Sequence, residues 1–269
     1  MSNQYRQWQP TLLIKATAVL HVIVLLIWLV MPEKWPWLLA IIIANHILIT
    51  AIGLWPRSHA LGPNWTQLPP AARIRNEIAL TIDDGPDPLV TPLVLDLLDH
   101  YGIKATFFCI AEKAELYPAL CRDIVQRGHN VENHSQQHRH YFSLLGYTGI
   151  KNEIQKAQDT LTNITGQRPL FFRAPAGLRN PFLDPVLTHL ELKLATWSVR
   201  GFDTRINNAK RVETKLLAGL KAGAILLMHD GNAARTSHGT PIIIDVLPNL
   251  FNAAKTHNLH FVTLRQAQM

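Results

Sequence analysis

The 269-residue chain contains several short clusters of side chains that could do chemistry. Asp83 and Asp84 are consecutive, and His134 and His138 are four residues apart. One helical turn would point both imidazoles the same way, whereas the side chains of consecutive acids diverge. Two imidazoles with one carboxylate leave a coordination position open, which is typical of a catalytic rather than a structural zinc site. The other carboxylate would stay free beside the ion, where it could act as a base.

Both patterns also have a purely structural explanation. A chain with 13 histidines produces chance pairs at this spacing. Asp, Gly and Pro all favour turns, so residues 83–86 predict a turn in any case. We favour the chemical interpretation because three further polar clusters follow other apolar runs, at Arg173, Asp203 and His229.

Short apolar runs alternate with helical patterns through the last 196 residues, from 74 to 269. This alternation predicts a mostly parallel sheet with helices outside it. About seven strand–helix units predict a distorted, closed or nearly closed (β/α) barrel, in which reactive groups gather at the carboxyl ends of the strands. An open doubly wound sheet is the alternative, but no GxGxxG motif supports it. The expected strands are 78–82, 105–110, 130–132, 170–172, 194–199, 224–228 and 261–264, and the expected helices are 91–101, 117–127, 147–165, 208–221 and 242–257.

Four motifs carry a family resemblance. TIDDGP at 81–86 resembles the T-F-D-D-G-P motif of the polysaccharide deacetylases, the NodB-like carbohydrate esterase family 4. HSQQH at 134–138 is similar to their H-S/T-x-x-H motif, and RAPAG at 173–177 to their R-x-P-x/Y-G motif. LLMHDG at 226–231 resembles their closing leucine–histidine motif. One motif alone would be weak evidence, but all four occur in the family's order and spacing over roughly residues 74–266.

The resemblance implies which residues hold the metal. Asp84, His134 and His138 correspond to the metal ligands, and Asp83 to the general base. The implied cofactor is a divalent metal, and zinc suits two imidazoles and a carboxylate, although cobalt, nickel or manganese stay open.

The resemblance also implies the remaining roles. His229 corresponds to the general acid that protonates the leaving amine, and Asp203 would orient it. Arg173 corresponds to the arginine that pairs with the base. The backbone N–H of Ala176, together with the metal, would stabilise the oxyanion.

One motif departs from the family pattern. Many members have D-x-x-D-W where residues 200–204 read RGFDT, so Arg200 replaces the first aspartate and Thr204 the tryptophan. Ala176 stands where an aromatic residue is common. These differences imply a substrate contact unlike that of chitin or peptidoglycan deacetylases.

Two uncharged apolar runs, 16–32 and 35–55, precede the motifs. Each approaches the ~20 residues that cross a bilayer as a helix. A signal peptide would explain only the first run, and a buried core hairpin is the other alternative. Trp28, Trp35 and Trp37 cluster where an aromatic belt would lie at one membrane face. We therefore expect three segments: a membrane anchor with two transmembrane helices at 1–55, a linker at 56–73 and a polysaccharide deacetylase (NodB-like) catalytic domain at 74–269.

The flanks of this hairpin suggest its orientation. The turn between the runs is nearly neutral, and the excess of positive charge lies outside them, which favours the cytoplasm for both ends of a multi-pass protein of the inner (cell) membrane. A periplasmic catalytic domain stays open. Within the runs, His21, Asn45 and His46 are expected to bind the two helices together. The basic residues behind the orientation are Arg6, Lys15, Arg57, Arg73 and Arg75.

Charge and cysteine content argue against a nucleic acid partner and a disulfide-stabilised fold. The net charge of +7 comes without a basic run, a paired-cysteine zinc module or a stacking motif, so we expect no nucleic acid partner. Attraction to anionic membrane lipid explains the charge more simply. Cys109 and Cys121 suggest no disulfide framework.

The expected function is metal-dependent hydrolysis of the N-acyl (acetyl) group of an amino sugar in a glycan or lipid-linked saccharide. The alternative is a catalytically inactive, membrane-tethered glycan-binding protein.

Overall fold

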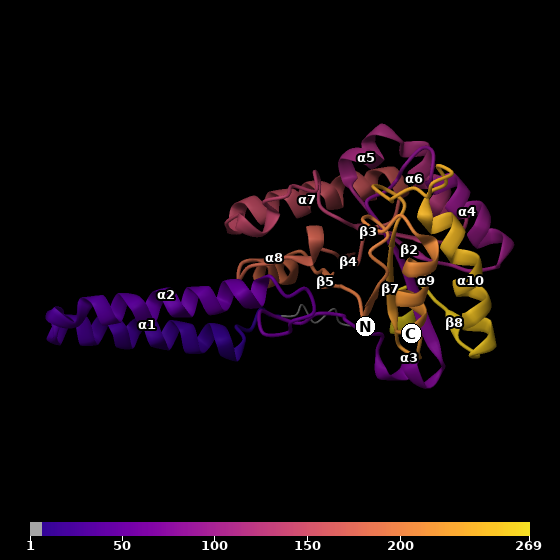
Figure 1. The fold of residues 1–269 in the computed structure, drawn as a ribbon. Helices are drawn as coiled ribbons and strands as arrows, with labels where there is room; N and C mark the ends of the chain where they lie inside the picture. Colours follow the sequence, from indigo (N-terminus) through magenta and orange to yellow (C-terminus); the bar gives the residue numbers. More distant parts are fainter. Residues whose placement is uncertain (1–6) are drawn as a thin grey trace.

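The computed structural model describes residues 7–269 as an α/β domain from which a two-helix hairpin projects (Figure 1). The hairpin consists of α1 (Leu12–Val30) and α2 (Trp35–Gly53), joined by the 3₁₀ turn Pro32–Lys34. Mean hydropathy is 2.5 for Leu12–Val30 and 1.9 for Pro32–Gly53. No residue of α1 is buried, and few residues of α2 are. The hairpin is therefore not the core of a soluble domain.

The polar residues inside the hairpin face one another between its two helices. Thr17 Oγ1 donates a hydrogen bond to Asn45 Oδ1 at 3.2 Å. One turn further along, the rings of His21 and His46 meet edge to face with their centroids 5.4 Å apart. Such contacts hold helices together where the surroundings offer no other hydrogen-bond partner.

The base of the hairpin is docked on the α/β domain. The carbonyl of Gly53 accepts a hydrogen bond from the backbone N–H of Arg179 at 3.1 Å. A Cβ at position 53 would lie 2.2 Å from the Arg179 carbonyl oxygen, so only glycine permits this approach. Trp8 Nε1 donates to Asp184 Oδ2 at 3.0 Å, and Thr11 Oγ1 to the Ala60 carbonyl at 2.7 Å. These contacts set the position of the hairpin relative to the domain.

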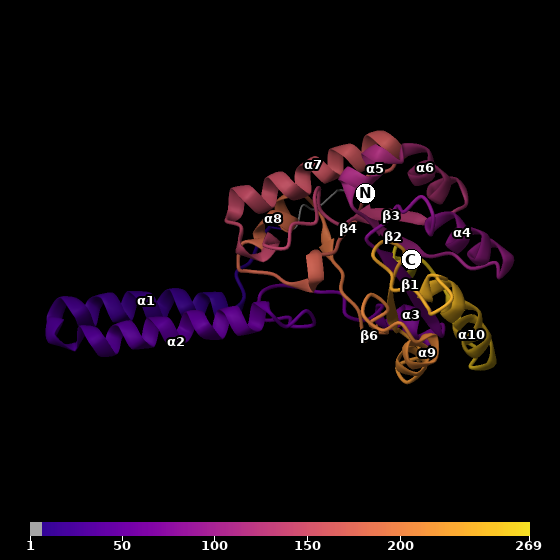
Figure 2. The same cartoon turned by 45° about the horizontal axis from the view of Figure 1, so that its top comes forward.

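The described strands form one parallel sheet in the order β5-β4-β3-β2-β1-β7-β6, with β8 paired to the start of β1. Strands β5 and β6 remain at its two edges, so the sheet curls into a half-barrel rather than closing. The helices lie outside this sheet (Figure 2). The strands are β1 (Glu77–Asp83), β2 (Thr106–Cys109), β3 (Asn130–Asn133), β4 (Phe171–Phe172), β5 (Lys193–Leu194), β6 (Val199–Arg200), β7 (Ile225–His229) and β8 (His260–Phe261).

The domain's helices match the expected ones where the helical pattern of apolar residues extends over a long segment. The expected helix over 147–165 is α7, and the other four long helices agree to within a few residues. Three short helices, α3, α5 and α8, were not predicted. The α-helices are α3 (Pro70–Ile74), α4 (Thr91–His100), α5 (Ala111–Leu116), α6 (Pro118–Gln126), α7 (Tyr147–Thr165), α8 (Leu183–His189), α9 (Ala209–Leu217) and α10 (Ile242–Thr256), and 3₁₀ turns lie at Phe142–Leu144, Pro175–Gly177 and Gln266–Gln268.

The prediction of one strand over 194–199 is wrong. This run forms β5 and β6 at opposite edges of the sheet, because the chain crosses the open side of the half-barrel between them. Ala195 still pairs with the end of β4 and bridges to Trp65, whereas the N–H of Ser198 already bonds to Ile225 of β7 at 3.0 Å.

The segment expected to link hairpin and domain, 56–73, packs against this open side. Trp65 hydrogen-bonds through its backbone to Leu194 and Thr196, at 2.8 and 2.9 Å. Leu68 is 3% exposed, and its N–H bonds to Gly223 just before β7. The segment thus covers the gap between the two edges of the sheet.

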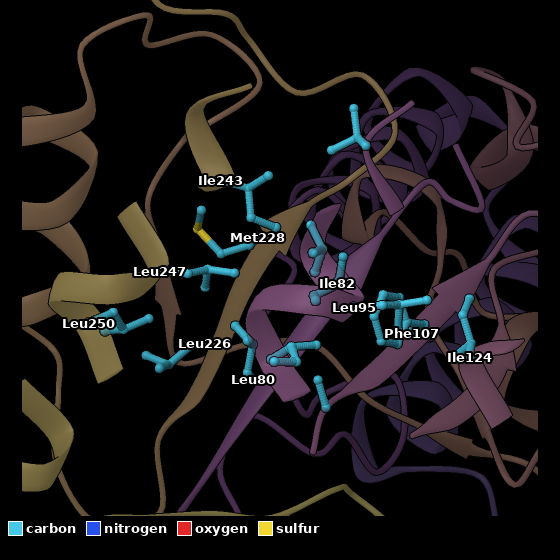
Figure 3. Close-up of a cluster of buried hydrophobic side chains, with 14 of the residues drawn as sticks. Leu80, Ile82, Leu95, Phe107, Ile124, Leu226, Met228, Ile243, Leu247 and Leu250 are labelled. Carbon is cyan, nitrogen blue, oxygen red and sulfur yellow. The ribbon is translucent and has the colours of Figure 1, made fainter. Parts of the chain in front are cut away.

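Alternate residues of the central strands face the helices and the interior of the half-barrel, as the two-residue period of a strand requires. In β1, Leu80 and Ile82 point outward into the cluster between the sheet and its helices (Figure 3). Thr81 and Asp83 point inward, where Thr81 Oγ1 donates to the Leu226 carbonyl at 2.8 Å. The inner face therefore becomes polar toward the carboxyl end of the strand.

Burial of the outer cluster stabilises the domain. Leu226 is fully buried and points toward Leu247 and Leu250 of α10 (Figure 3). We expect Leu226→Ala to lower the free energy of unfolding by about 2–5 kcal/mol, because it removes apolar contacts and leaves a cavity. Urea unfolding of the full chain in detergent, followed by tryptophan fluorescence, measures the change.

The matched control is Leu144→Ala, because that side chain is 83% exposed. Its expected effect is within about 0.5 kcal/mol. Equal effects of the two substitutions would contradict the packing described here.

Candidate active site

Asp84, His134 and His138 converge at the carboxyl ends of β1 and β3. Asp84 Oδ1 lies 3.2 Å from His134 Nε2 and 3.3 Å from His138 Nε2. The three ligand atoms all lie within 4.8 Å of one another, and the two imidazole centroids are 4.8 Å apart. The structure thus brings together the three residues that the sequence predicted as metal ligands.

The hydrogen-bonding pattern of this cluster is compatible with a cation bound between the three side chains. His134 Nδ1 lies 2.8 Å from the Arg173 carbonyl oxygen, which can only accept, so the ring proton is on Nδ1. The lone pair of His134 Nε2 then faces the carboxylate oxygen Asp84 Oδ1, a buried atom without a hydrogen-bond partner among residues 7–269. A cation between these electron-rich atoms removes their repulsion, and a histidine that donates its other N–H to a carbonyl is typical of metal sites.

The loop that presents the two histidines is not the helical turn that their spacing predicted. Ser135 and His138 have positive φ angles of 65° and 50°, which an α-helix excludes. Side chains replace the helical hydrogen bonds: Ser135 Oγ accepts from the His138 N–H at 3.0 Å, and Asn133 Oδ1 from the Ser135 N–H at 2.9 Å. Asn133 is in turn held by Gln158 of α7 at 2.8 Å. Such strained backbone persists where its surroundings hold it, and it is common at functional sites.

Asp83 lies beside the cluster and is bound by a fully buried arginine. Arg173 Nη1 donates to Asp83 Oδ1 at 2.6 Å, while Asp83 Oδ2 is 3.8 Å from His134 Nε2. The other N–H groups of Arg173 bond to Thr81 Oγ1 and to the carbonyls of Ala195 and Thr196. The guanidinium is therefore fixed, and it leaves one oxygen of Asp83 facing the site.

His229 completes the site from β7, where it is the register partner of Asp83 on β1. Asp203 binds it twice, accepting from His229 Nδ1 at 2.9 Å and from its backbone N–H at 2.7 Å. Burial by itself lowers the pKa of His229, but the charge and hydrogen bond of Asp203, with the charges of Asp83 and Asp84, outweigh burial and raise it to about 8. The imidazole is thus held as a proton donor at neutral pH.

Ala176 lies at the same rim, on the loop after β4 and three residues beyond Arg173. Its φ of 54° puts it in the left-handed region inside the turn Pro175–Gly177. Among the described residues, no hydrogen bond ties its N–H to the cluster. Its predicted role in binding an oxyanion stays a prediction.

Sequence reasoning missed two residues that hold Asp84. Asn232 Nδ2 donates to Asp84 Oδ2 at 3.2 Å, and Lys113 Nζ donates to the Asp84 carbonyl at 2.8 Å. Neither Asn232 nor Lys113 stands in a pattern that indicates chemistry, so only the structure identifies them.

The close approach of two strand ends explains a glycine in the closing motif. A Cβ at Gly231 would lie 2.1 Å from the Asp84 carbonyl oxygen. Next to it, Asp230 is fully buried and accepts a hydrogen bond from Thr91 Oγ1, and burial raises the pKa of Asp230 to about 6. Through these bonds and its own N–H bond to the Asp83 carbonyl, Asp230 links the end of β1 to the start of α4.

Comparison with known proteins finds similar sequences and a similar fold. The family described as polysaccharide deacetylase matches residues 72–195. The peptidoglycan-N-acetylglucosamine deacetylase PgdA of Listeria monocytogenes is 38% identical over 161 residues, which cover 60% of this chain and 34% of that protein. The chain therefore spans only about a third of this relative's length.

Two further similarities cover most of the compared protein. A chitooligosaccharide deacetylase of Azorhizobium caulinodans is 33% identical over 165 residues, which cover 60% of this chain and 78% of that protein. The crystal structure of the Bc1960 peptidoglycan N-acetylglucosamine deacetylase superposes with a TM-score of 0.69 at 28% identity, covering 76% of this chain and 92% of the other. On its motifs, its curled parallel sheet and these relatives, the chain belongs to the polysaccharide deacetylase family.

Proposed function

We propose that this protein is a membrane-anchored, metal-dependent amidase that removes the N-acetyl, or a similarly small N-acyl, group from an amino sugar. The observation that carries the proposal is the convergence of Asp84, His134 and His138 with a free acid and a proton donor beside them. The relatives' names support an amino sugar as the substrate.

Zinc is the metal that we propose for the cluster. Two imidazoles and one carboxylate with an open position form a typical catalytic zinc set. When bound there, a divalent cation would polarise the amide carbonyl and make water more acidic.

The side chains around the cluster can supply the remaining steps. Asp83, fixed by Arg173 on one oxygen, accepts the proton of the attacking water on the other. His229 donates a proton to the leaving nitrogen, and Asp203 keeps it protonated for that step. General acid–base help of this kind typically contributes about 10²–10⁴-fold. The N–H of Ala176 would face the developing negative charge on the carbonyl oxygen.

The alternative, an inactive glycan-binding protein, has less support. An inactive relative would be expected to have lost a ligand or a proton-transfer group. Here all three ligands are present, together with Asp83 and His229, and hydrogen bonds orient His134, Asp83 and His229.

We further propose that the hairpin spans the inner membrane and that both ends of the chain lie in the cytoplasm. Each helix has 19 residues, about 28 Å at ~1.5 Å per residue, close to the ~30 Å hydrocarbon core. Trp35 and Trp37 lie at its tip and Trp8 and Trp55 at its base, as aromatic belts at two interfaces would. Arg6, one of the charges behind the orientation, lies outside the described residues. In this orientation the substrate is a lipid-linked saccharide at the membrane surface.

Removal of a ligand tests the metal site. We expect His134→Ala to lose bound metal and turnover together, because the two remaining ligands hold an ion weakly. Metal content by mass spectrometry and acetate or formate released from a panel of N-acylated amino sugars measure the two effects.

The matched control for this variant is Asp83→Asn, which removes the base and keeps all three ligands. It is expected to keep the metal and to lose at least about 10²-fold in turnover. Metal retained by His134→Ala at the wild-type level would refute the ligand assignment.

The proton donor is tested through its pKa. In metal-free protein, NMR titration should show His229 losing its proton near pH 8. Asp203→Asn removes the charge that opposes burial, so the pKa of His229 should fall, and the form able to donate a proton should disappear at lower pH. Activity of the metal-loaded variant should accordingly decline at lower pH than that of the wild type. An unchanged pKa in Asp203→Asn would show that Asp203 does not control the acid.

Topology is tested with reporters fused to the carboxyl terminus. We expect a fluorescent protein fusion to be bright in cells and an alkaline phosphatase fusion to be inactive, because the phosphatase folds only outside the cytoplasm. An active phosphatase would place the domain in the periplasm and make an exported polysaccharide or peptidoglycan the better substrate.

A further inference from the structure

A second pocket, of about 620 Å³, lies between the base of the hairpin and the edge of the sheet at β6. Trp55 and Arg57 line it from the segment that follows α2. Residues 197–200 and Phe202 line it from β6 and its flanks, and Lys215 lines it from α9. It is distinct from the metal cluster, none of whose ligands line it.

The pocket is strongly positive. Arg57, Arg200 and Lys215 line it, and no acidic residue does. Within residues 7–269, none of the three cations forms an ion pair, and the one hydrogen bond among them joins Arg57 Nη1 to the Ser198 carbonyl at 3.3 Å. Three unpaired cations around one concavity repel one another, and an anion between them would remove that repulsion.

Arg200 is positioned to bind such an anion. Its guanidinium carbon lies 5.3 Å from the Trp197 ring centroid and 5.1 Å from that of Phe202, so two rings hold it. Arg200 Nε is buried and has no hydrogen-bond partner in the described chain. A buried N–H of a charged group without a partner is costly, and the planar N–H fork of arginine matches the oxygens of a phosphate.

The pocket adjoins the active site through its own lining. Phe202 precedes Asp203, which binds His229. On the other side, the guanidinium carbon of Arg173, the residue that binds Asp83, lies 5.9 Å from the Trp197 ring centroid. The pocket therefore lies next to the residues that position the proposed acid and base.

The pocket also adjoins the membrane side of the domain. Trp55 lies two residues beyond α2, and the Gly53 carbonyl is bound by the Arg179 N–H. A group in this pocket would therefore lie at the base of the hairpin, at the level expected for lipid headgroups.

We propose that this pocket binds the phosphate group of a glycosyl phosphate whose N-acylated sugar occupies the active site. The proposal rests on the proposed function for the identity of the sugar, and it adds an anionic requirement that neutral chitin fragments do not meet. Many family members have an aspartate at the position of Arg200, so this chain has the opposite charge at this wall of the pocket. In a lipid-linked saccharide, this phosphate would join the sugar to its carrier.

The test is direct binding by the full chain in nanodiscs of phosphatidylcholine, with Asp83→Asn as the background so that no probe is consumed. The probes are N-acetylglucosamine 1-phosphate and the neutral methyl N-acetylglucosaminide, measured by isothermal titration calorimetry. We expect Arg200→Gln to weaken the phosphate probe about tenfold or more, as the loss of a hydrogen bond to a charged group does. The neutral probe should bind unchanged.

Lys215→Gln, at an exposed position, should also selectively weaken the phosphate probe. Its matched control, Arg211→Gln, lies one turn earlier on α9 and does not line the pocket, so it should weaken neither probe. Equal weakening of both probes in Arg200→Gln, or a phosphate probe that binds no better than the neutral one, would overturn the proposal.

Bulk anionic lipid is the other source of phosphate. Repeating the titrations in nanodiscs that contain phosphatidylglycerol separates the two: if this lipid abolishes the Arg200-dependent preference, the pocket binds bulk headgroups and the substrate assignment is wrong. Binding is measured without turnover. An Arg200-dependent phosphate preference in a wild-type protein that releases no acyl group would refute the proposed activity and leave the phosphate site standing.

Discussion

The buried ion pair between Arg173 and Asp83 is the contact on which the active site depends. Arg173 has no solvent exposure, and its N–H groups reach β1 and the crossing between β5 and β6. Its own carbonyl accepts the Nδ1 proton of His134. One residue therefore orients both the proposed base and a proposed ligand. Breaking a buried pair by removing one partner typically costs ~3–5 kcal/mol, so site and interior are stabilised together.

The two kinds of histidine in the site differ because their surroundings differ. Burial lowers the pKa of His138 to about 4, which keeps its ring neutral, as a ligand must be. The pKa of His229 moves the other way because Asp203 contacts it directly. Environments that push pKa values apart in one pocket indicate which group holds a metal and which donates a proton.

Much of this arrangement could be predicted from the sequence because the chemistry lies at the ends of strands. Apolar runs such as 78–82 are long enough to identify, and the residues after them are of types that rarely cluster by chance. What could not be predicted depends on contacts between distant segments. The splitting of 194–199 requires Trp65, more than a hundred residues away, to pair with Ala195.

The backbone conformation of the site could not be predicted from the sequence either. The HSQQH spacing suggested a helical turn, but Ser135 and His138 take left-handed conformations that side-chain hydrogen bonds from Asn133 and Ser135 sustain. The residue types predicted that the imidazoles converge, and the structure places their ring centroids 4.8 Å apart. How they converge depends on α7, which fixes Asn133.

The docking of the hairpin gives one departure from the family pattern, Arg200, a structural setting. Arg200 lies in a pocket whose opposite wall, Trp55 to Arg57, follows directly from α2. A soluble relative without such a hairpin would have no wall there, and a carboxylate at position 200 would repel phosphate. Because Gly53 and Arg179 hold the hairpin against the domain, the distance from the proposed membrane surface to Asp83 and His229 is set by the fold. The proposed selection of a substrate at the bilayer then requires no movement of the catalytic groups.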